Sequence, residues 1–415
     1  MSFSDLLEQV VNRSLCTTCG ACELACPSEL IEFDGLVPKL RPGVTDAACG
    51  SCTDCLQTCP GADPETPRAE LELFGRARTA GERWLGIYRA VRGARARQSD
   101  VFARSASGGS TTTLLRIAME RLRLDVLLTM GRSTSRAWRS AAVLRTDPDE
   151  LLRDAQSTYQ LAPYLGCLRR ALVDKPGRPI GMVGLACHVQ GLRKLQRMAT
   201  EMGRLARECV VFVVEIACSS GTTPKGTETI ITDVLGLDLG SVAEVRYRDG
   251  PYPGQLRVWT RDGTIHDVPF WKAVRHFAAF KTHRCLACGD WMSGLADLSV
   301  SDGDTNIFNS SLGLHSIEKH GRVFVRTELG ARVLRWSEED GALETWPIEL
   351  YGNNLGLERK RNRRAAFERS MAAIPEGPVP GYVEPGEIVQ DAALIATPAE
   401  RVAANTDATP TASKL

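Results

Sequence analysis

The sequence has almost no net charge and no long hydrophobic run. Its 51 Lys and Arg residues are balanced by 50 Asp and Glu residues, which leaves a formal charge of +1. A chain without a dominant charge offers no global electrostatic attraction to nucleic acid or to a membrane surface. The longest apolar stretch, residues 209–218, is interrupted by Glu215 and is far shorter than the ~20 residues of a membrane-spanning helix. We therefore expect no nucleic-acid partner and no membrane span.

Signals for export and for histidine metal sites are also missing. The N-terminus lacks the basic segment and apolar run of a secretory signal, and the six His residues form no ligand pair such as H-x3-H. The last three residues, Ser413-Lys414-Leu415, spell a peroxisomal address. However, Arg far outnumbers Lys, which is typical of a GC-rich bacterial genome. Bacteria have no receptor that recognises this targeting signal. We expect a cytoplasmic protein.

Cysteine, by contrast, is abundant and clustered. The chain has 14 Cys residues, and eight of them lie between Cys16 and Cys59. Disulfides are not expected, because the thiols of a protein without an export signal are kept reduced. Clustered cysteines in such a chain indicate metal binding.

The eight cysteines form two copies of one motif. The copies are Cys16-x2-Cys19-x2-Cys22-x3-Cys26-Pro27 and Cys49-x2-Cys52-x2-Cys55-x3-Cys59-Pro60. In two-cluster ferredoxins with this spacing, the last cysteine of each run binds the other cluster. We therefore predict one [4Fe–4S] cluster on Cys16, Cys19, Cys22 and Cys59, and a second on Cys49, Cys52, Cys55 and Cys26. A pair of zinc sites is the alternative, although zinc needs neither the third cysteine of each run nor the proline.

The residues that follow alternate between strands and helices. We expect strands at 125–130, 141–144, 179–183 and 210–216, and helices at 114–122 and 187–198. Further short strands at 244–247, 256–259 and 265–268 predict a β-meander. The expected fold class is an α+β ferredoxin-like cluster module followed by a larger α/β domain with a mixed, mostly parallel sheet.

The composition divides the chain into five parts. The cluster module takes residues 1–70, and an Arg-rich connector, helical in part, takes residues 71–100. The α/β domain extends over residues 101–350. A basic helix is expected at 351–372, and the Pro-, Ala- and Thr-rich tail at 373–415 is expected to be largely disordered.

Four further cysteines are candidate ligands. Cys187 and Cys218 each follow a predicted strand, at the sheet edge where parallel strands place their ligands. Cys285 and Cys288 form a C-x2-C pair, which supplies half of a four-cysteine site. The spacing leaves two interpretations open: a third four-thiolate site, or buried apolar cysteines at 187 and 218. Cys167 and Cys209 are expected to be structural.

A run of small residues marks a candidate phosphate site at the start of a helix. It consists of Ser107, Gly108, Gly109, Ser110, Thr111 and Thr112. Paired glycines let backbone N–H groups approach an anion, and the helix N-terminus adds partial positive charge. The alternative is an ordinary Ser/Thr helix cap.

Taken in order, these motifs resemble the coenzyme F420 hydrogenase/dehydrogenase beta-subunit family over about residues 14 to 305. The matching residues are Ser107, Gly108, Gly109, Thr112, Leu114, Leu115, Cys187, Cys218, Lys281, Arg284, Cys285, Cys288, Asp290 and Ala296-Asp297-Leu298. The neighbours of two cysteines depart from the family pattern, since Ala186 and His188 flank Cys187 and Ser219 follows Cys218. These departures leave the substrate open.

The resemblance implies a flavin- and iron–sulfur-dependent oxidoreductase. Family members bind FAD and iron–sulfur clusters, and several exchange a hydride with the deazaflavin coenzyme F420. By the match, Cys187, Cys218, Cys285 and Cys288 become ligands of a third [4Fe–4S] cluster, and residues 107–112 become FAD contacts. His188 and Lys281 are the expected side chains near the flavin.

The expected partners follow from this chemistry. A redox coenzyme or another small molecule supplies or takes two electrons, and a ferredoxin or a redox subunit exchanges single electrons with the clusters. Two alternatives are a ferredoxin-dependent reductase of another organic substrate and a relay subunit without catalysis.

Overall fold

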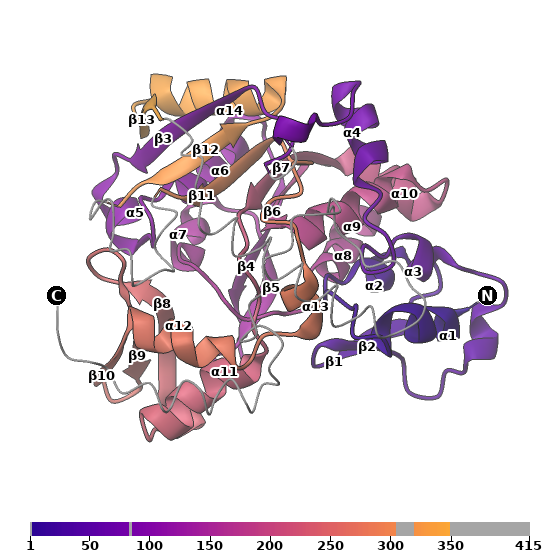
Figure 1. Cartoon of the computed structure of the whole chain (residues 1–415), viewed down its shortest axis with the longest axis horizontal. Helices are drawn as coiled ribbons and strands as arrows, with labels where there is room; N and C mark the ends of the chain where they lie inside the picture. The colour runs from indigo at the N-terminus through magenta and orange to yellow at the C-terminus, as the bar shows by residue number, and fades with distance from the viewer. Residues whose placement is uncertain (1, 83–84, 304–318, 349–415) are drawn as a thin grey trace.

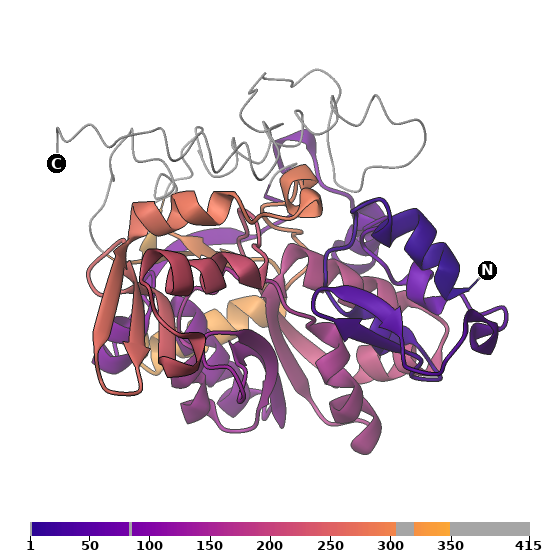
Figure 2. The ribbon, with the colours of Figure 1, turned by 90° about the horizontal axis from the view of Figure 1, so that it is seen from below.

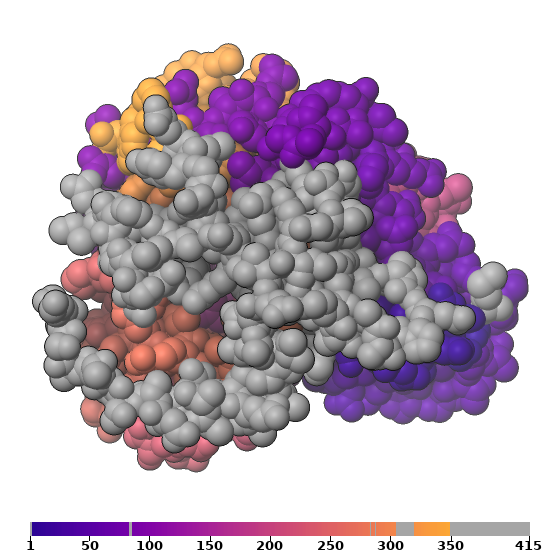
Figure 3. Space-filling model, in the orientation of Figure 1, coloured from indigo at the N-terminus to yellow at the C-terminus, as the bar shows by residue number. Residues whose placement is uncertain are grey.

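The structure, a computed structural model, describes residues 2–82, 85–303 and 319–348. The expected basic helix at 351–372 and the tail at 373–415 lie outside the described residues. Figure 3 shows the N-terminal segment (indigo) and residues of the meander (orange) on opposite sides of one face of the molecule. Among the described residues, no helix combines the length and the apolar character that crossing a membrane requires.

The cysteine-rich segment folds as a β-hairpin with short helices (Figure 1). A tight turn joins β1 (Ile31–Asp34) to β2 (Val37–Leu40), and Gly35 allows it because its φ of 62° favours glycine. The helices are α1 (Phe3–Leu6), α2 (Ala21–Ala25), α3 (Asp54–Gln57) and α4 (Thr66–Phe74). Few apolar side chains fill the centre, chiefly Phe3, Leu6, Val10, Leu15 and Ile31 among the cysteines. A module with so small a core needs additional support, such as a bound metal group.

Eight strands form the main sheet, in the order β13-β3-β12-β11-β7-β6-β4-β5. They are β3 (Ala90–Ala96), β4 (Val126–Arg132), β5 (Ser140–Arg145), β6 (Ile180–Leu185), β7 (Val210–Ile216), β11 (Leu298–Asp302), β12 (Gly321–Val325) and β13 (Leu343–Pro347). β4, β6, β7 and β11 are parallel neighbours, β3 runs in the same direction, and β5, β12 and β13 run oppositely. The expected mixed, mostly parallel sheet is confirmed.

Helices cover both faces of this sheet. On one face lie α8 (Leu168–Asp174), α9 (Ala186–Arg197) and α10 (Glu201–Cys209), and on the other lie α6 (Ser110–Arg121), α7 (Leu151–Asp154) and α14 (Glu328–Glu339). Leu127 and Leu128 of β4 enter different cores, because successive side chains of a strand point to opposite faces. The central strands are therefore apolar at nearly every position.

The connector expected at residues 71–100 contains a strand of the main sheet. The expectation of a partly helical link is wrong for β3, which pairs with β12 and β13. Two arginines interrupt the apolar pattern that would identify this strand in the sequence. One of them, Arg95, forms an ion pair with Glu344 of β13 at 2.9 Å. Gly93 lets the strand pack closely, since a Cβ there would meet the Trp346 ring at 2.4 Å. A short helix, α5 (Ser99–Arg104), follows β3.

The expected meander forms a separate three-stranded sheet (Figure 2). Its strands are β8 (Val242–Asp249), β9 (Gln255–Thr260) and β10 (Ile265–Pro269), all antiparallel. It packs with α11 (Pro224–Thr229) and α12 (Phe270–Ala278) around its own apolar core. The chain then returns to the main sheet through α13 (His283–Ala287).

The N-terminal module packs directly into the core of the main domain. Cys19, Ala21 and Leu24 belong to the same buried cluster as Leu165 and Leu192. The Leu165 N–H donates to the Cys19 carbonyl oxygen at 2.8 Å. Gly191 of α9 makes this approach possible, because a Cβ there would lie only 3.0 Å from the Ala21 Cβ. Module and domain therefore share one interior.

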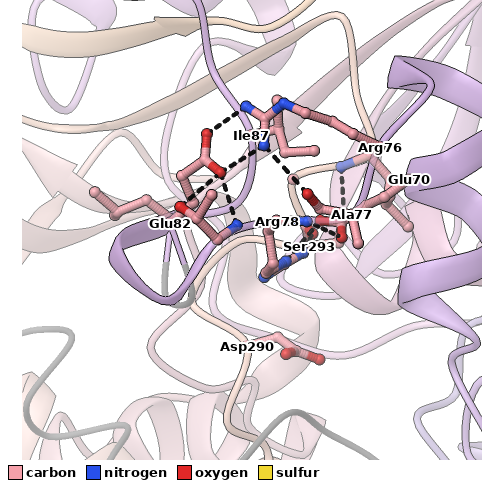
Figure 4. Close-up of polar contacts among 12 residues, drawn as sticks. Glu70, Arg76, Ala77, Arg78, Glu82, Ile87, Asp290 and Ser293 are labelled. Atoms are coloured by element: carbon pink, nitrogen blue, oxygen red, sulfur yellow. Dashed lines mark hydrogen bonds and ion pairs between the residues drawn. The ribbon is translucent and has the colours of Figure 1, made fainter.

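A buried ion pair fastens the segment that follows the module (Figure 4). Arg78 Nε donates to Glu70 of α4 at 2.6 Å, and the two side chains are 5% and 1% exposed. Arg78 Nη2 also donates to the Ser293 carbonyl oxygen at 2.7 Å. Nearby, Arg76 pairs with Glu82 at 2.6 Å. Loss of one partner of such a buried pair strands a charge and costs about 3–5 kcal/mol, so this contact holds α4 firmly against the domain.

The close approach at Gly191 gives a first prediction. Gly191→Val is expected to lower the free energy of unfolding by about 1–3 kcal/mol, because overpacking forces the core to move. The new Cβ would meet Ala21 Cβ at 3.0 Å and Leu165 Cδ1 at 3.2 Å. Gly81→Val is the matched control, since the nearest atom to its Cβ is Thr79 Oγ1 at 4.0 Å. Equal urea midpoints for the two variants would contradict the close docking.

Candidate functional site

Four cysteines of the module surround one small internal cavity. Its lining contains Cys16, Cys19, Cys22 and Cys59 with apolar neighbours such as Leu6, Val10 and Phe33. Cys22 interacts electrostatically with Cys19, Cys59 and Cys16, and more weakly with Cys55. The first three cysteines of one run thus lie with the last cysteine of the other. This is the first cysteine group, and it has the membership that the crossed ferredoxin pattern predicts.

The other four module cysteines form the second cysteine group. Cys55 interacts electrostatically with Cys52, Cys26 and Cys49, and Cys52 interacts with Cys26. Cys26 and Cys55 are buried, whereas Cys49 and Cys52 are half-buried. The second group therefore lies nearer the surface than the first.

Burial controls the protonation of these thiols. It raises the pKa of Cys16 to about 11 and that of Cys19 and Cys55 to about 12. At neutral pH the free thiols therefore hold their protons, and a metal group must displace them when it binds. Backbone N–H groups already point at two of the sulfurs: Thr18 donates to Cys16 Sγ at 3.4 Å and Leu30 donates to Cys26 Sγ at 3.3 Å.

Cys187, Cys218, Cys285 and Cys288 come together as a third cysteine group. Burial raises the pKa of Cys187, and thiolates at the other three positions, and at Cys19 of the first group, would raise it further, so all four lie near it. The third group therefore lies beside the first, across the interface between domain and module. In the part of the chain that the structure describes, no three or more His, Cys, Asp or Glu side chains are arranged to hold a metal ion. The role of the third group as a cluster site stays a prediction.

The sheet and its loops position the third group. Leu185 and Ile216 are paired at the ends of β6 and β7, and Cys187 and Cys218 each follow two residues later. The Cys218 N–H donates to the Trp291 carbonyl oxygen at 2.9 Å. Thr282 caps α13 by accepting the Cys285 N–H at 3.3 Å. The expectation that strand ends bring Cys187 and Cys218 to one edge is confirmed.

A cavity of about 270 Å³ opens at the same edge of the sheet. Its wall contains the ends of four parallel strands, including Leu185, Ile216 and Asp302. Cys218 also lines it, so the cavity adjoins the third cysteine group. Ligands of α/β proteins bind at the carboxyl ends of parallel strands, which makes this cavity the candidate cofactor and substrate pocket.

The predicted phosphate segment forms one wall of the pocket. Ser107, Gly109, Ser110, Thr111 and Thr112 line it, whereas Gly108 packs against the backbone of His320. Gly109 is the N-cap of α6 with φ +79°, a conformation that favours glycine. The first turn of a helix leaves backbone N–H groups without intrahelical acceptors, and these groups suit the phosphates of a dinucleotide. The residues present therefore fit the phosphate groups of a bound ligand.

His188 lines the pocket as an uncharged side chain. Burial lowers its pKa to about 3. The ring stacks on Tyr164 at 4.3 Å between centroids, and its Nδ1 accepts the Leu185 N–H at 3.2 Å. The remaining proton therefore resides on Nε2, which leaves a neutral donor.

Lys281, the other expected side chain near the flavin, does not line the pocket. It pairs with Thr222 in an isolated antiparallel β-bridge. Thr222 follows Gly221 of the pocket wall, so Lys281 lies close to the pocket, and its expected place near the flavin stays a prediction.

The pocket wall also contains an ion pair that the sequence does not predict. Arg248 of β8 pairs with Asp302 of β11 at 2.7 Å, and both residues line the pocket. The Arg248 side chain is 1% exposed and lies over the rings of Tyr252 and Phe270. The two residues belong to strands that are far apart in the sequence, so no short motif predicts the pair.

Comparison with known families matches three segments of the chain. The model of a 4Fe-4S dicluster domain matches residues 15–62. The models of the coenzyme F420 hydrogenase/dehydrogenase beta subunit match residues 91–169 (N-term) and 177–350 (C terminus). The two beta-subunit models together cover more than half of the chain.

Individual relatives agree with the family models. The coenzyme F420 hydrogenase subunit beta of Methanosarcina barkeri is 26% identical over 71% of this chain and 96% of its own length. One of the subunits of the F420H2 dehydrogenase of Methanosarcina mazei is 23% identical over 86% of this chain and 92% of its own. A chain in the F420-reducing [NiFe] hydrogenase complex from M. barkeri superposes with a TM-score of 0.55 at 23% identity, covering 70% of this chain and 96% of that one.

The shared fold, the motif order and the cysteine arrangement all indicate the same family. The chain joins a 4Fe-4S dicluster segment to both parts of the beta-subunit fold. The protein therefore belongs to the coenzyme F420 hydrogenase/dehydrogenase beta-subunit family of iron–sulfur oxidoreductases.

Proposed function

We propose that the protein passes electrons between a two-electron partner at FAD in the pocket and one-electron carriers at the module, through three [4Fe–4S] clusters. The observation that carries this proposal is a series of neighbouring cysteines that begins at the pocket. Cys218 lines the pocket, Cys187 of the same group interacts with Cys19, and Cys22 interacts with Cys55 of the second group. The series leads from the pocket to the surface of the module.

Residues 107–112 are proposed to hold the FAD phosphates at the N-terminus of α6. When bound, FAD exchanges two electrons with a hydride partner and single electrons with a cluster. The chain contributes orientation and shielding from water: Tyr164 and Trp291 are buried in the pocket wall. His188 stays neutral across the physiological range, because burial lowers its pKa to about 3, so it donates a hydrogen bond from Nε2 but does not deliver a proton.

Coenzyme F420 is the proposed two-electron partner, because the named relatives belong to an F420 hydrogenase and an F420H2 dehydrogenase. The same relatives suggest a redox partner protein. The decisive assay mixes the purified protein with reduced F420 and follows bleaching of the flavin absorbance. Bleaching supports the proposal. Bound flavin without bleaching favours a reductase of another organic substrate, and clusters without flavin favour a relay role.

Iron analysis tests the number of clusters. The protein is expected to contain about 12 iron and 12 sulfide, with four of each per [4Fe–4S] cluster. Cys52→Ser should lose one cluster of the module, whereas Cys167→Ser should lose none, because Cys167 packs against the apolar core. A content of eight iron with zinc at the third group would exclude the third cluster.

A substitution in α6 tests the phosphate contacts. Thr111→Glu is expected to reduce the flavin content of the purified protein at least tenfold, because the carboxylate repels a phosphate. Thr111 lies in the first turn of α6, where an acidic side chain is compatible with the helix dipole, so the fold should be preserved. Thr111→Val keeps the shape without the charge and should retain most of the flavin. Full flavin in the Glu variant would overturn the assignment.

The third cysteine group is tested by interrupting the series of neighbouring cysteines. Cys288→Ser is expected to keep FAD and the module clusters, so a two-electron donor should still reduce the flavin. Reduction of a one-electron acceptor at the module should fall at least tenfold. If Cys288 is instead a buried structural cysteine, the Ser variant should lose about 1–3 kcal/mol of stability, because the new hydroxyl has no hydrogen-bond partner. The rates of flavin reduction and of acceptor reduction should then both be unchanged. Stopped-flow measurement of the two rates separates these outcomes.

A further inference from the structure

Arg284 is a buried cation with unused hydrogen-bond donors. It lies in α13, directly before Cys285, and is 2% exposed. In the part of the chain that the structure describes, its Nε and Nη1 atoms have no hydrogen-bond partner. Arginine cannot shed its charge under ordinary conditions, and a buried, unpaired guanidinium is costly. Its position therefore requires negative charge that the polypeptide alone supplies only in part.

Cysteines of two groups lie near Arg284. Those of the third group are Cys187, Cys285 and Cys288, and the Asp290 carboxylate lies near it as well. Burial by itself lowers the pKa of Arg284, and these neighbours raise it above its ordinary value. Asp290 is shared, because it also accepts a hydrogen bond from Gln190 at 2.9 Å.

The first cysteine group is also near Arg284. Burial raises the pKa of Cys16 and Cys59, and Arg284 opposes this rise in both. The same guanidinium therefore acts on two groups of thiolates that belong to different parts of the fold. Its flat fork of donors allows hydrogen bonds in more than one direction.

A [4Fe–4S] cluster with four thiolates is negatively charged, and it becomes more negative when it accepts an electron. A fixed cation beside the cluster therefore favours the reduced form, as do hydrogen bonds to its sulfur atoms. Because the site excludes water, this attraction is weakly screened. A cation placed between two clusters adjusts both potentials in the same direction.

We propose that Arg284 is a positioning residue that donates hydrogen bonds to sulfur atoms of the first and third clusters, and so raises the reduction potential of both. This inference rests on the third cluster of the proposed function. It adds that the electron step between domain and module is adjusted by one side chain rather than by two independent environments.

Arg284→Gln and Arg284→Lys test this role in the full-length, cluster-loaded protein. Iron and sulfide are counted first, and the midpoint potentials are then measured by redox titration with electron paramagnetic resonance. In the Gln variant, both potentials are expected to become more negative by at least about 59 mV, which is tenfold in the one-electron equilibrium constant. The Lys variant keeps the positive charge but loses the planar set of guanidinium N–H donors. A smaller shift of both midpoint potentials, with the same sign, is therefore expected.

Arg193→Gln is the matched control. Arg193 lies on α9, near Cys187 in sequence, but it donates to the Leu295 carbonyl oxygen and to Gln196, and its charged neighbours are Asp297, Glu215 and Arg197. The cluster potentials of this variant should be unchanged.

The outcomes separate this inference from the proposed function. A content of eight iron atoms per unmodified protein overturns both the third cluster and the role of Arg284. Twelve iron with unchanged potentials in the Gln variant overturns the role of Arg284 alone. If the Gln variant fails to load its clusters, the Lys variant decides: a negative shift of both potentials supports the inference, and no shift overturns it.

Discussion

The contact between α2 and α9 across Gly191 is the constraint on which the rest of the arrangement depends. Gly191 lets Ala21 and Cys19 of the module approach the helix that begins beside Cys187. The hydrogen bond from Leu165 to the Cys19 carbonyl fixes the register of this approach. Because module and domain share one core there, the first and third cysteine groups are neighbours across an interior rather than across a solvent gap.

Buried charged side chains fix the loop that follows Cys288. Glu215 interrupts the apolar strand β7, yet it is fully buried and accepts the backbone N–H groups of Ser293 and Gly294. Arg78 binds the Ser293 carbonyl from the other side. Satisfied in this way, a buried carboxylate orders the segment that follows Cys288. The loop near the third group is therefore held by polar contacts from two distant parts of the chain.

The sequence predicts those features that depend on local spacing. Repeated cysteines, alternating apolar runs and the Ser-Gly-Gly segment identified the module, the central strands β4 to β7 and a wall of the pocket. Strand β3 was not predicted because its two arginines interrupt the apolar pattern of a buried strand, and one of them, Arg95, pairs with Glu344 of the neighbouring strand. The Arg248–Asp302 pair and the position of Arg284 also escaped, since tertiary packing creates them and no short motif encodes them.

For the proposed function, the firm attachment of the module limits how one-electron carriers can reach its cysteine groups. The shared core at Gly191 and the buried Glu70–Arg78 pair prevent the module from acting as a swinging carrier that travels to its partner. Under the proposed function, a one-electron partner would therefore dock on the module. The second cysteine group would offer the place, because Cys49 and Cys52 are half-buried and no residue of the stretch 46–53 is buried. This edge, shaped by a few short turns, is where selectivity among one-electron carriers would be decided.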